Sequence, residues 1–311
     1  MRQATIAVDA MGGDHGVANV VGAVNKFLEK NNAIKFLLVG NENVVKGFTL
    51  HKNIKVVHAE HSISMNDSPV EAIRAKRNSS IKVALDLVKN GEADAFVSTG
   101  STGAIVALAK LTLGTIAGVK RPVLAAEAVD CFGRSRLFLD LGANVDCSAK
   151  MLHQFAILGH KAYKMLHKDQ QEPKTALFNV GREQVKGSVI IKEAAQLLDA
   201  DTTINYAGFV EGDQVVGSDA DIIVVDGFTG NIALKSVEGA IKVMLGDKSL
   251  LRDILLLLFK KQIKKRIALR PGPAAMLLGI KKPVFKIHGS AKQEHIIQAL
   301  NVVSNMIGVV A

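Results

Sequence analysis

Aromatic residues and cysteines are scarce in this sequence. It has no tryptophan, two tyrosines and two cysteines in 311 residues. Cys131 and Cys147 form no CxxC pair and have no histidine at metal-ligand spacing, so a disulfide framework and a zinc site are disfavoured. Because few aromatic side chains are available to stack on bases, nucleic acid is not an expected partner, although the net charge is +10.

Long apolar runs are missing as well. The longest in the C-terminal third, residues 254–259, is far shorter than the roughly 20 residues that a membrane-spanning helix needs. The first residues form a strand-like stretch without the basic region, apolar core and cleavage site of a signal peptide. The sequence therefore predicts a cytoplasmic protein that does not cross a membrane.

Most hydrophobic residues are Ala, Val, Ile and Leu, which is typical of buried parallel strands and the helices that cover them. Short strand-like segments alternate with segments of helical periodicity. The expected strands are residues 5–9, 35–39, 54–58, 95–98, 123–128, 137–140, 176–180 and 222–225. The expected helices are residues 18–30, 79–89, 102–111, 149–167, 188–198 and 231–245. This alternation predicts an α/β fold with a mostly parallel sheet and helices on both faces.

The length is sufficient for one catalytic unit with two lobes around a cleft. The expected boundaries are the turn near residues 118–122 and the segment 281–283, where proline cannot continue a central strand. One lobe would comprise about residues 1–120 with 284–311, and the other about residues 121–283.

Loops rich in glycine and polar residues follow several predicted strands, and the carboxyl ends of parallel strands form the ligand crevice of an open α/β sheet. These loops are residues 9–16, 98–103, 140–146 and 226–231. Any one of them alone is better explained as a helix cap, but four together favour a site. Loop 98–103 leads into an apolar helix whose N-terminus would attract an anion, and inorganic phosphate is the expected ligand. The candidate binding residues are Gly12, Gly13, Asp14, Ser98, Gly100, Ser101, Thr102, Gly103, Asp146, Asp226 and Asn231.

Several familiar motifs are missing from the sequence. It has no Walker A loop and no dinucleotide fingerprint after a strand, which disfavours hydrolysis of nucleoside triphosphates and nicotinamide binding. It has no nucleophile elbow and no Ser-His-Asp order, so a covalent acyl-enzyme is not expected. Direct attack by a bound substrate fits better.

Cations and histidines supply further candidates. Lys186, with Arg182 four residues earlier, follows a predicted strand and would place positive charge beside a phosphate oxygen. A solvated surface lysine is the commoner explanation for such a residue. His15 and His288 lie beside glycines, and Ser290, a further candidate binding residue, lies two positions after His288. Their rings would either bind phosphate and protonate a leaving group, or anchor the loops.

Five segments together resemble the bacterial phosphate acyltransferase family of phospholipid synthesis, and the resemblance runs nearly end to end. They are residues 7–16, 98–104, 139–147, 225–231 and 288–290. The resemblance implies transfer of a long-chain fatty acyl group from acyl carrier protein to inorganic phosphate, giving acyl phosphate for phosphatidic acid synthesis. It also implies a homodimer without metal or nucleotide cofactor, and a downstream glycerol-3-phosphate acyltransferase. The implied fold has three layers, α/β/α, and is similar to isocitrate and isopropylmalate dehydrogenases and to phosphotransacetylases.

Three departures from the family pattern affect local detail. Ser101 stands where asparagine is usual, and Arg182 follows Gly181 where glutamate is common. Residues 270–274 replace a Gly-Gly-Ala run.

Under the implied reaction, Lys186 would hold phosphate while a phosphate oxygen attacks the thioester carbonyl. Backbone N–H groups near residues 142–144 and the amides of Asn144 and Asn231 are candidates to stabilise the oxyanion. Asn144, Lys186, His15 and His288 are thus the candidate catalytic residues.

Residues 249–270 are expected to form a basic amphipathic helical segment. Its candidate contact residues are Leu255, Leu258, Phe259, Lys260, Lys261, Lys264, Lys265 and Arg266. An anionic membrane surface, an acidic carrier protein and a structural role all suit such a segment. The first would make the protein peripheral to the inner face of the plasma membrane.

Two other functions stay open at this point. A phosphotransacetylase acting on an acyl-coenzyme A would share the anion-binding loops. A non-catalytic scaffold that binds membranes or carrier protein would explain the basic segment alone.

Overall fold

The computed structural model describes residues 3–48, 51–64, 67, 78–130, 133–167, 172–215, 217–245 and 269–308. The chain divides into two compact units. Unit 1 comprises Met1–Pro122 with Pro273–Ala311, and unit 2 comprises Val123–Gly272. That these units act as two lobes of one catalytic cleft stays a prediction.

Unit 1 contains a mostly parallel sheet in the order β3-β2-β1-β4-β11-β10. Four of its strands pair in parallel, and β11 joins β4 in parallel but pairs antiparallel with β10. The strands are β1 (Ala4–Asp9), β2 (Ile34–Gly40), β3 (Ile54–His58), β4 (Ala95–Ser98), β10 (Leu269–Leu278, which begins in unit 2) and β11 (Val284–Lys286). Most of β1 and all of β4 are buried, as expected for strands with both faces covered.

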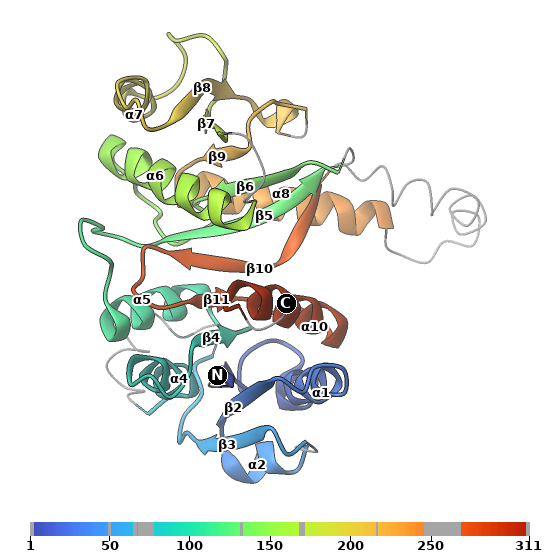
Figure 1. The fold of residues 1–311 in the computed structure, drawn as a ribbon. Coiled ribbons are helices and arrows are strands. Elements are labelled where there is room, and N and C mark those ends of the chain that lie inside the picture. The colour runs from blue at the N-terminus through green and yellow to red at the C-terminus, as the bar shows by residue number, and fades with distance from the viewer. Residues whose placement is uncertain are drawn as a thin grey trace, which may run out of the picture. The chain divides into compact units, whose positions relative to one another are not determined.

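Helices cover both faces of this sheet (Figure 1). They are α1 (Gly16–Leu28), α2 (Glu42–Lys46), α4 (Ser80–Lys89), α5 (Thr102–Leu113) and α10 (Gln293–Met306). Helix α1 packs against α10 on one face, and α4 packs against α5 on the other. Because β1 and β4 are parallel neighbours, the loops that lead into α1 and α5 leave the same edge of the sheet.

Unit 2 has a sheet in the order β5-β6-β9-β7-β8. Its strands are β5 (Val123–Asp130), β6 (Ser135–Leu139), β7 (Lys174–Phe178), β8 (Asn205–Val210) and β9 (Ile222–Val224). All neighbouring pairs are parallel except the β5–β6 hairpin. Part of its core consists of Ala176, Val210, Ala220 and Ile223.

The described part of unit 2 also contains three long helices and a short 3-10 helix. They are α6 (Ala149–Leu166), α7 (Val189–Asp199), α8 (Gly227–Leu245) and η1 (Gly212–Gln214). Helix α6 packs against α7 and covers one face of the sheet, and α8 lies across the other face (Figure 1). Ser148 and Ser188 cap α6 and α7 by accepting backbone N–H groups of their first turns.

Buried bonds of Arg136 fix β6 to the end of β5 and to the segment before β9. Arg136 and Asp130 are both almost fully buried and lie 2.9 Å apart. Arg136 also donates to the carbonyl oxygens of Ser218, at 2.6 Å, and Ala220, at 3.1 Å. These bonds satisfy the guanidinium group in an interior where an unpaired charge would be strongly unfavourable.

The predicted fold class is confirmed: the sheet of each unit is mostly parallel, with helices on both faces. All eight expected strands are present, whereas α2, β8, β10, β11 and α10 were not expected. Helix α8 begins at Gly227, four residues before the expected start at residue 231, so most of the predicted loop 226–231 is helical.

The predicted basic helical segment 249–270 falls mostly outside the described residues. This includes its contact candidates Leu255, Leu258, Phe259, Lys260, Lys261, Lys264, Lys265 and Arg266. The prediction is wrong at residues 269–270, which belong to strand β10. Within the described ranges, no helix is long and apolar enough to cross a membrane.

Candidate functional site

Two loops of unit 1 are joined through the buried carboxylate of Asp9. Its Oδ2 accepts a hydrogen bond from Ser98 Oγ at 2.7 Å, and its Oδ1 accepts one from the backbone N–H of Met11 at 3.1 Å. Ser98 Oγ accepts in turn from the N–H of Gly100 at 2.8 Å. Burial raises the pKa of the Asp9 carboxyl, and these hydrogen bonds act in the opposite direction.

The approach of the two loops is so close that glycine is required at residue 12. A Cβ atom on Gly12 would lie 2.7 Å from the backbone N of Gly100 and 2.8 Å from Asp9 Oδ2. Gly13 has a φ of +86°, and a Cβ atom there would lie 2.7 Å from the Thr99 hydroxyl. Gly12 and Gly13, proposed as binding residues, thus shape the loop with their backbone.

The N-terminus of α5 lies at this junction. The N-cap Ser101 makes no side-chain capping bond to the described part of the chain, and the first turn has no acidic residue. Thr102 and Gly103 are in that first turn. Thr99 is buried, and its hydroxyl has no partner among the described residues. The junction therefore presents the positive end of a helix dipole together with hydroxyl groups, which suits an anion.

The two candidate histidines of unit 1, His15 and His288, both contact Ser290. His15 Nε2 lies 3.2 Å from the carbonyl oxygen of Ser290, and the N–H of Asp14 donates to the carbonyl of Gly289 at 2.9 Å. His288 Nδ1 accepts the N–H of Ser290 at 3.2 Å and lies 2.9 Å from its hydroxyl. These contacts fit the loop-anchor alternative. The catalytic roles of His15 and His288 stay predictions.

In unit 2, the buried carboxylate of Asp140 organises the loop after β6. It accepts the backbone N–H groups of Gly142, Ala143 and Asn144 at 3.2, 3.0 and 2.7 Å. It also accepts Asn144 Nδ2 at 2.8 Å and the N–H of Leu124 at 3.1 Å. Burial raises the pKa of the Asp140 carboxyl, while the hydrogen bonds lower it.

This network gives the predicted oxyanion donors another partner. The N–H groups of residues 142–144 and the Asn144 amide all donate to Asp140, so the geometry favours a positioning role for Asn144. The carbonyl oxygen of Asn144 accepts the N–H of Gly227 at 2.8 Å, which ties the loop to the start of α8. Asn231 lies beside Gly142: a Cβ atom on that glycine would be 3.6 Å from the Asn231 side chain.

The loop after β7 carries the two predicted cations. Asn179 is buried, and its Nδ2 donates to the carbonyl oxygens of Gly181 at 3.0 Å and Lys186 at 3.4 Å. The side chains of Arg182 and Lys186 are exposed. Arg182 donates to Gln214, whereas the chain of Lys186 lies over Gly181. Asn179 thus shapes the loop that presents both cations.

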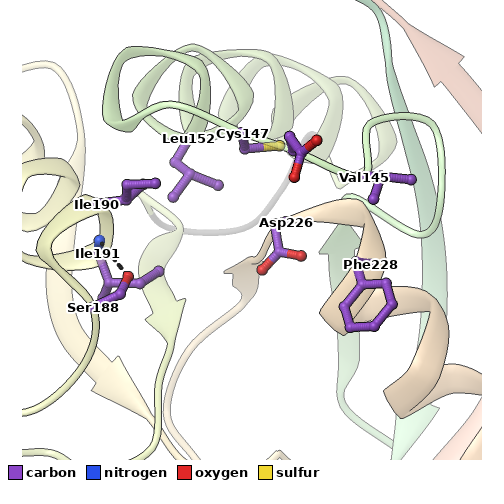
Figure 2. Close-up of a pocket in the computed structure, with 9 residues that line it drawn as sticks. Val145, Cys147, Leu152, Ser188, Ile190, Ile191, Asp226 and Phe228 are labelled. Atoms are coloured by element: carbon purple, nitrogen blue, oxygen red, sulfur yellow. Dashed lines mark hydrogen bonds between the residues drawn. The ribbon is translucent and has the colours of Figure 1, made fainter.

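A cavity of about 460 Å³ lies in unit 2, next to these loops (Figure 2). It is lined by Val145, Asp146, Cys147, Leu152, Ser188, Ile190, Ile191, Asp226 and Phe228. Two of its polar groups also cap helices: Ser188 Oγ accepts the N–H of Ile191 at 3.3 Å, and Asp226 Oδ1 accepts the N–H of Thr229 at 2.8 Å. Among the described residues, no cluster of three or more His, Cys, Asp or Glu could hold a metal ion.

The predicted site residues therefore fall into two groups. In unit 1, the loop contacts bring together Gly12, Gly13, Asp14, His15, Ser98, Gly100, Ser101, Thr102, Gly103, His288 and Ser290. Unit 2 contains Asn144, Asp146, Arg182, Lys186, Asp226 and Asn231. Sequence reasoning missed Thr99, Asn179 and the apolar cavity residues, and did not select Asp140.

Known proteins resemble this chain over nearly its whole length. A family profile described as "Fatty acid synthesis protein" matches residues 4–309. The chain belongs to this family. A protein from Methylococcus capsulatus, named phosphate acyltransferase, is 41% identical over 92% of this chain and 88% of its own length. A protein of the same name from Shewanella sp. strain MR-4 is 38% identical, over 97% of this chain and 92% of its own.

These matches confirm the resemblance to bacterial phosphate acyltransferases that the five segments indicated. Among solved structures, a phosphotransacetylase from Streptococcus pyogenes superposes with a TM-score of 0.67 over 98% of this chain and 94% of its own. It is only 16% identical in sequence, so it shows the shared fold alone. The predicted similarity of the fold to phosphotransacetylases is also confirmed.

Proposed function

We propose that this protein is a phosphate acyltransferase that moves a long-chain fatty acyl group from acyl carrier protein to inorganic phosphate. The observation that carries the proposal is the 41% identity, over 92% of the chain, to a protein of that name. A phosphate oxygen attacks the thioester carbonyl carbon, the carbon–sulfur bond breaks, and the carrier leaves as a thiolate. The products are acyl phosphate and the carrier thiol.

The geometry supports a division of roles. Lys186 supplies an exposed cation that neutralises the attacking phosphate. Asn231, beside Gly142, is the best remaining amide donor for the developing oxyanion, because the donors of residues 142–144 are bound to Asp140. A carrier thiol has a reference pKa of about 8.5 and leaves readily as thiolate, so a general acid is not required. No protein nucleophile is needed for this sequence of bonds.

The carrier-protein specificity is tested with matched thioesters. Purified protein is given palmitoyl-acyl carrier protein or palmitoyl-coenzyme A with phosphate, and acyl phosphate is trapped by hydroxylamine as the hydroxamate. We expect product chiefly from the carrier-protein thioester. Faster product formation from the coenzyme A thioester would instead favour a phosphotransacetylase, which the shared fold alone supports. Absence of product from both thioesters would indicate a binding or scaffolding role instead.

The same proposal includes the oligomeric state, the location and the downstream partner of the protein. The protein acts as a homodimer, works in the cytoplasm at the inner face of the plasma membrane, and passes acyl phosphate to a glycerol-3-phosphate acyltransferase. The basic segment that would bind an anionic surface lies outside the described residues. Charge reversal of Lys264 and Lys265 should abolish sedimentation with anionic vesicles, and unchanged sedimentation would refute this part.

A further inference from the structure

We infer that the unit 2 cavity binds the acyl chain of the thioester and sets the chain-length preference. The reaction proposed above does not specify where the chain lies, and this assignment rests on that reaction. The cavity volume of about 460 Å³ is within the range of roughly 300–1,000 Å³ that small-molecule sites occupy.

The walls of the cavity are apolar. Ile190 and Leu152 lie on one side, and Val145 and Phe228 lie on the other, with Asp226 between them (Figure 2). Leu152 is 1% exposed and forms a buried part of the wall. Val145, Phe228 and Ile190 are 62%, 57% and 43% exposed, so large apolar side chains face water around a cavity. Such a surface gains free energy when a ligand covers it with hydrocarbon.

The polar groups of the lining disfavour an anion as the ligand. Two carboxylates, Asp146 and Asp226, face this space, and the lining contains no lysine or arginine. Phosphate would be repelled by the carboxylates, whereas a neutral hydrocarbon chain is not. Ser188 and Asp226 have their helix-cap bonds and do not require a polar ligand.

Residues that line the cavity are close in sequence to the residues proposed to act on the thioester. Phe228 and Asn231 are three positions apart on α8, so they lie on the same side of the helix. Ser188, in the lining, follows Lys186 by two residues. A thioester carbonyl held near Asn231 can therefore extend its alkyl chain past Phe228 into the cavity.

A substitution that fills the cavity tests this placement. Each buried methylene contributes about fourfold to binding, and the added volume of an indole displaces several methylenes. For Ile190→Trp we expect the ratio of kcat/KM for palmitoyl- over octanoyl-acyl carrier protein to fall at least about tenfold. Val145→Trp, on the opposite side, should lower the same ratio. The matched control is Val189→Trp, which is adjacent in α7, 70% exposed and not part of the lining.

The outcomes separate this inference from the proposed reaction. If both cavity variants fold, as judged by circular dichroism, and keep the wild-type ratio, the chain does not lie in this cavity. An equal fall in the Val189→Trp control would also overturn the assignment. If the wild-type protein forms no acyl phosphate, the proposed reaction fails, and cis-parinaric acid then probes the cavity directly. Its fluorescence should rise with wild-type protein and much less with Ile190→Trp; equal enhancement would refute the inference.

Discussion

Replacement of Asp140 by asparagine should lower the free energy of unfolding of unit 2 by about 2–6 kcal/mol. Oδ2 of Asp140 accepts two donors of Asn144, at 2.7 and 2.8 Å. Oδ1 accepts the backbone N–H groups of Leu124, Gly142 and Ala143. Asparagine has one carbonyl oxygen, so its NH2 group must face at least two of these donors. Each buried donor that loses its acceptor costs about 1–3 kcal/mol, which gives the range.

The two tyrosines of the chain provide a selective assay. Tyr163 and Tyr206 both lie in unit 2, and the sequence has no tryptophan, so intrinsic tyrosine fluorescence during urea denaturation reports on this unit. The control is Asp146→Asn, an exposed carboxylate of the same loop, which should change stability by less than about 0.5 kcal/mol. If Asp140→Asn unfolds at the same urea concentration as the control, the carboxylate does not organise the loop.

Three further results are expected. Burial raises the pKa of the Asp9 carboxyl above its unfolded-state value. As pH rises from the unfolded-state pKa to the folded-state pKa, the wild type should therefore lose stability relative to Asp9→Asn. Parallel pH profiles of the two proteins, from urea titrations followed by circular dichroism, would contradict this. Lys186→Ala should lower kcat/KM for phosphate at least about tenfold, whereas Lys150→Ala, exposed on α6, should not; equal kinetics would remove Lys186 from the site. Arg136→Met should cost about 3–5 kcal/mol in tyrosine-monitored unfolding, because it leaves Asp130 buried without its cation; a loss below about 1 kcal/mol would argue against that role.

Much of the fold was predictable because its strands are short and rich in apolar residues. The expected segments 54–58 and 95–98 coincide with β3 and β4. Helix α10 could have been found, since Ile296, Ala299, Leu300 and Val303 follow the helical spacing and are buried. Strand β10 could not, because it contains two prolines and a glycine, which ordinarily argue against a strand.

The site was predictable only where polar residues directly follow a strand. Asp9 and Ser98 end neighbouring parallel strands, so the closeness of their loops follows from the topology. The roles of Gly142–Asn144 were not accessible, because their N–H groups turn inward to Asp140. The cavity was also hidden: Val145, Ile190 and Phe228 come from separate segments, and exposed apolar residues there follow no periodic pattern.

Attack of a phosphate oxygen on the acyl carbon is the central claim, and isotope labelling tests it most directly. The purified protein is incubated with palmitoyl-acyl carrier protein and phosphate labelled with ¹⁸O at all four positions, and the intact acyl phosphate is analysed by mass spectrometry. We expect a product that appears only with phosphate and retains all four labelled oxygens, including the bridging one. A product with an unlabelled bridging oxygen, or fatty acid released without acyl phosphate, would contradict the account.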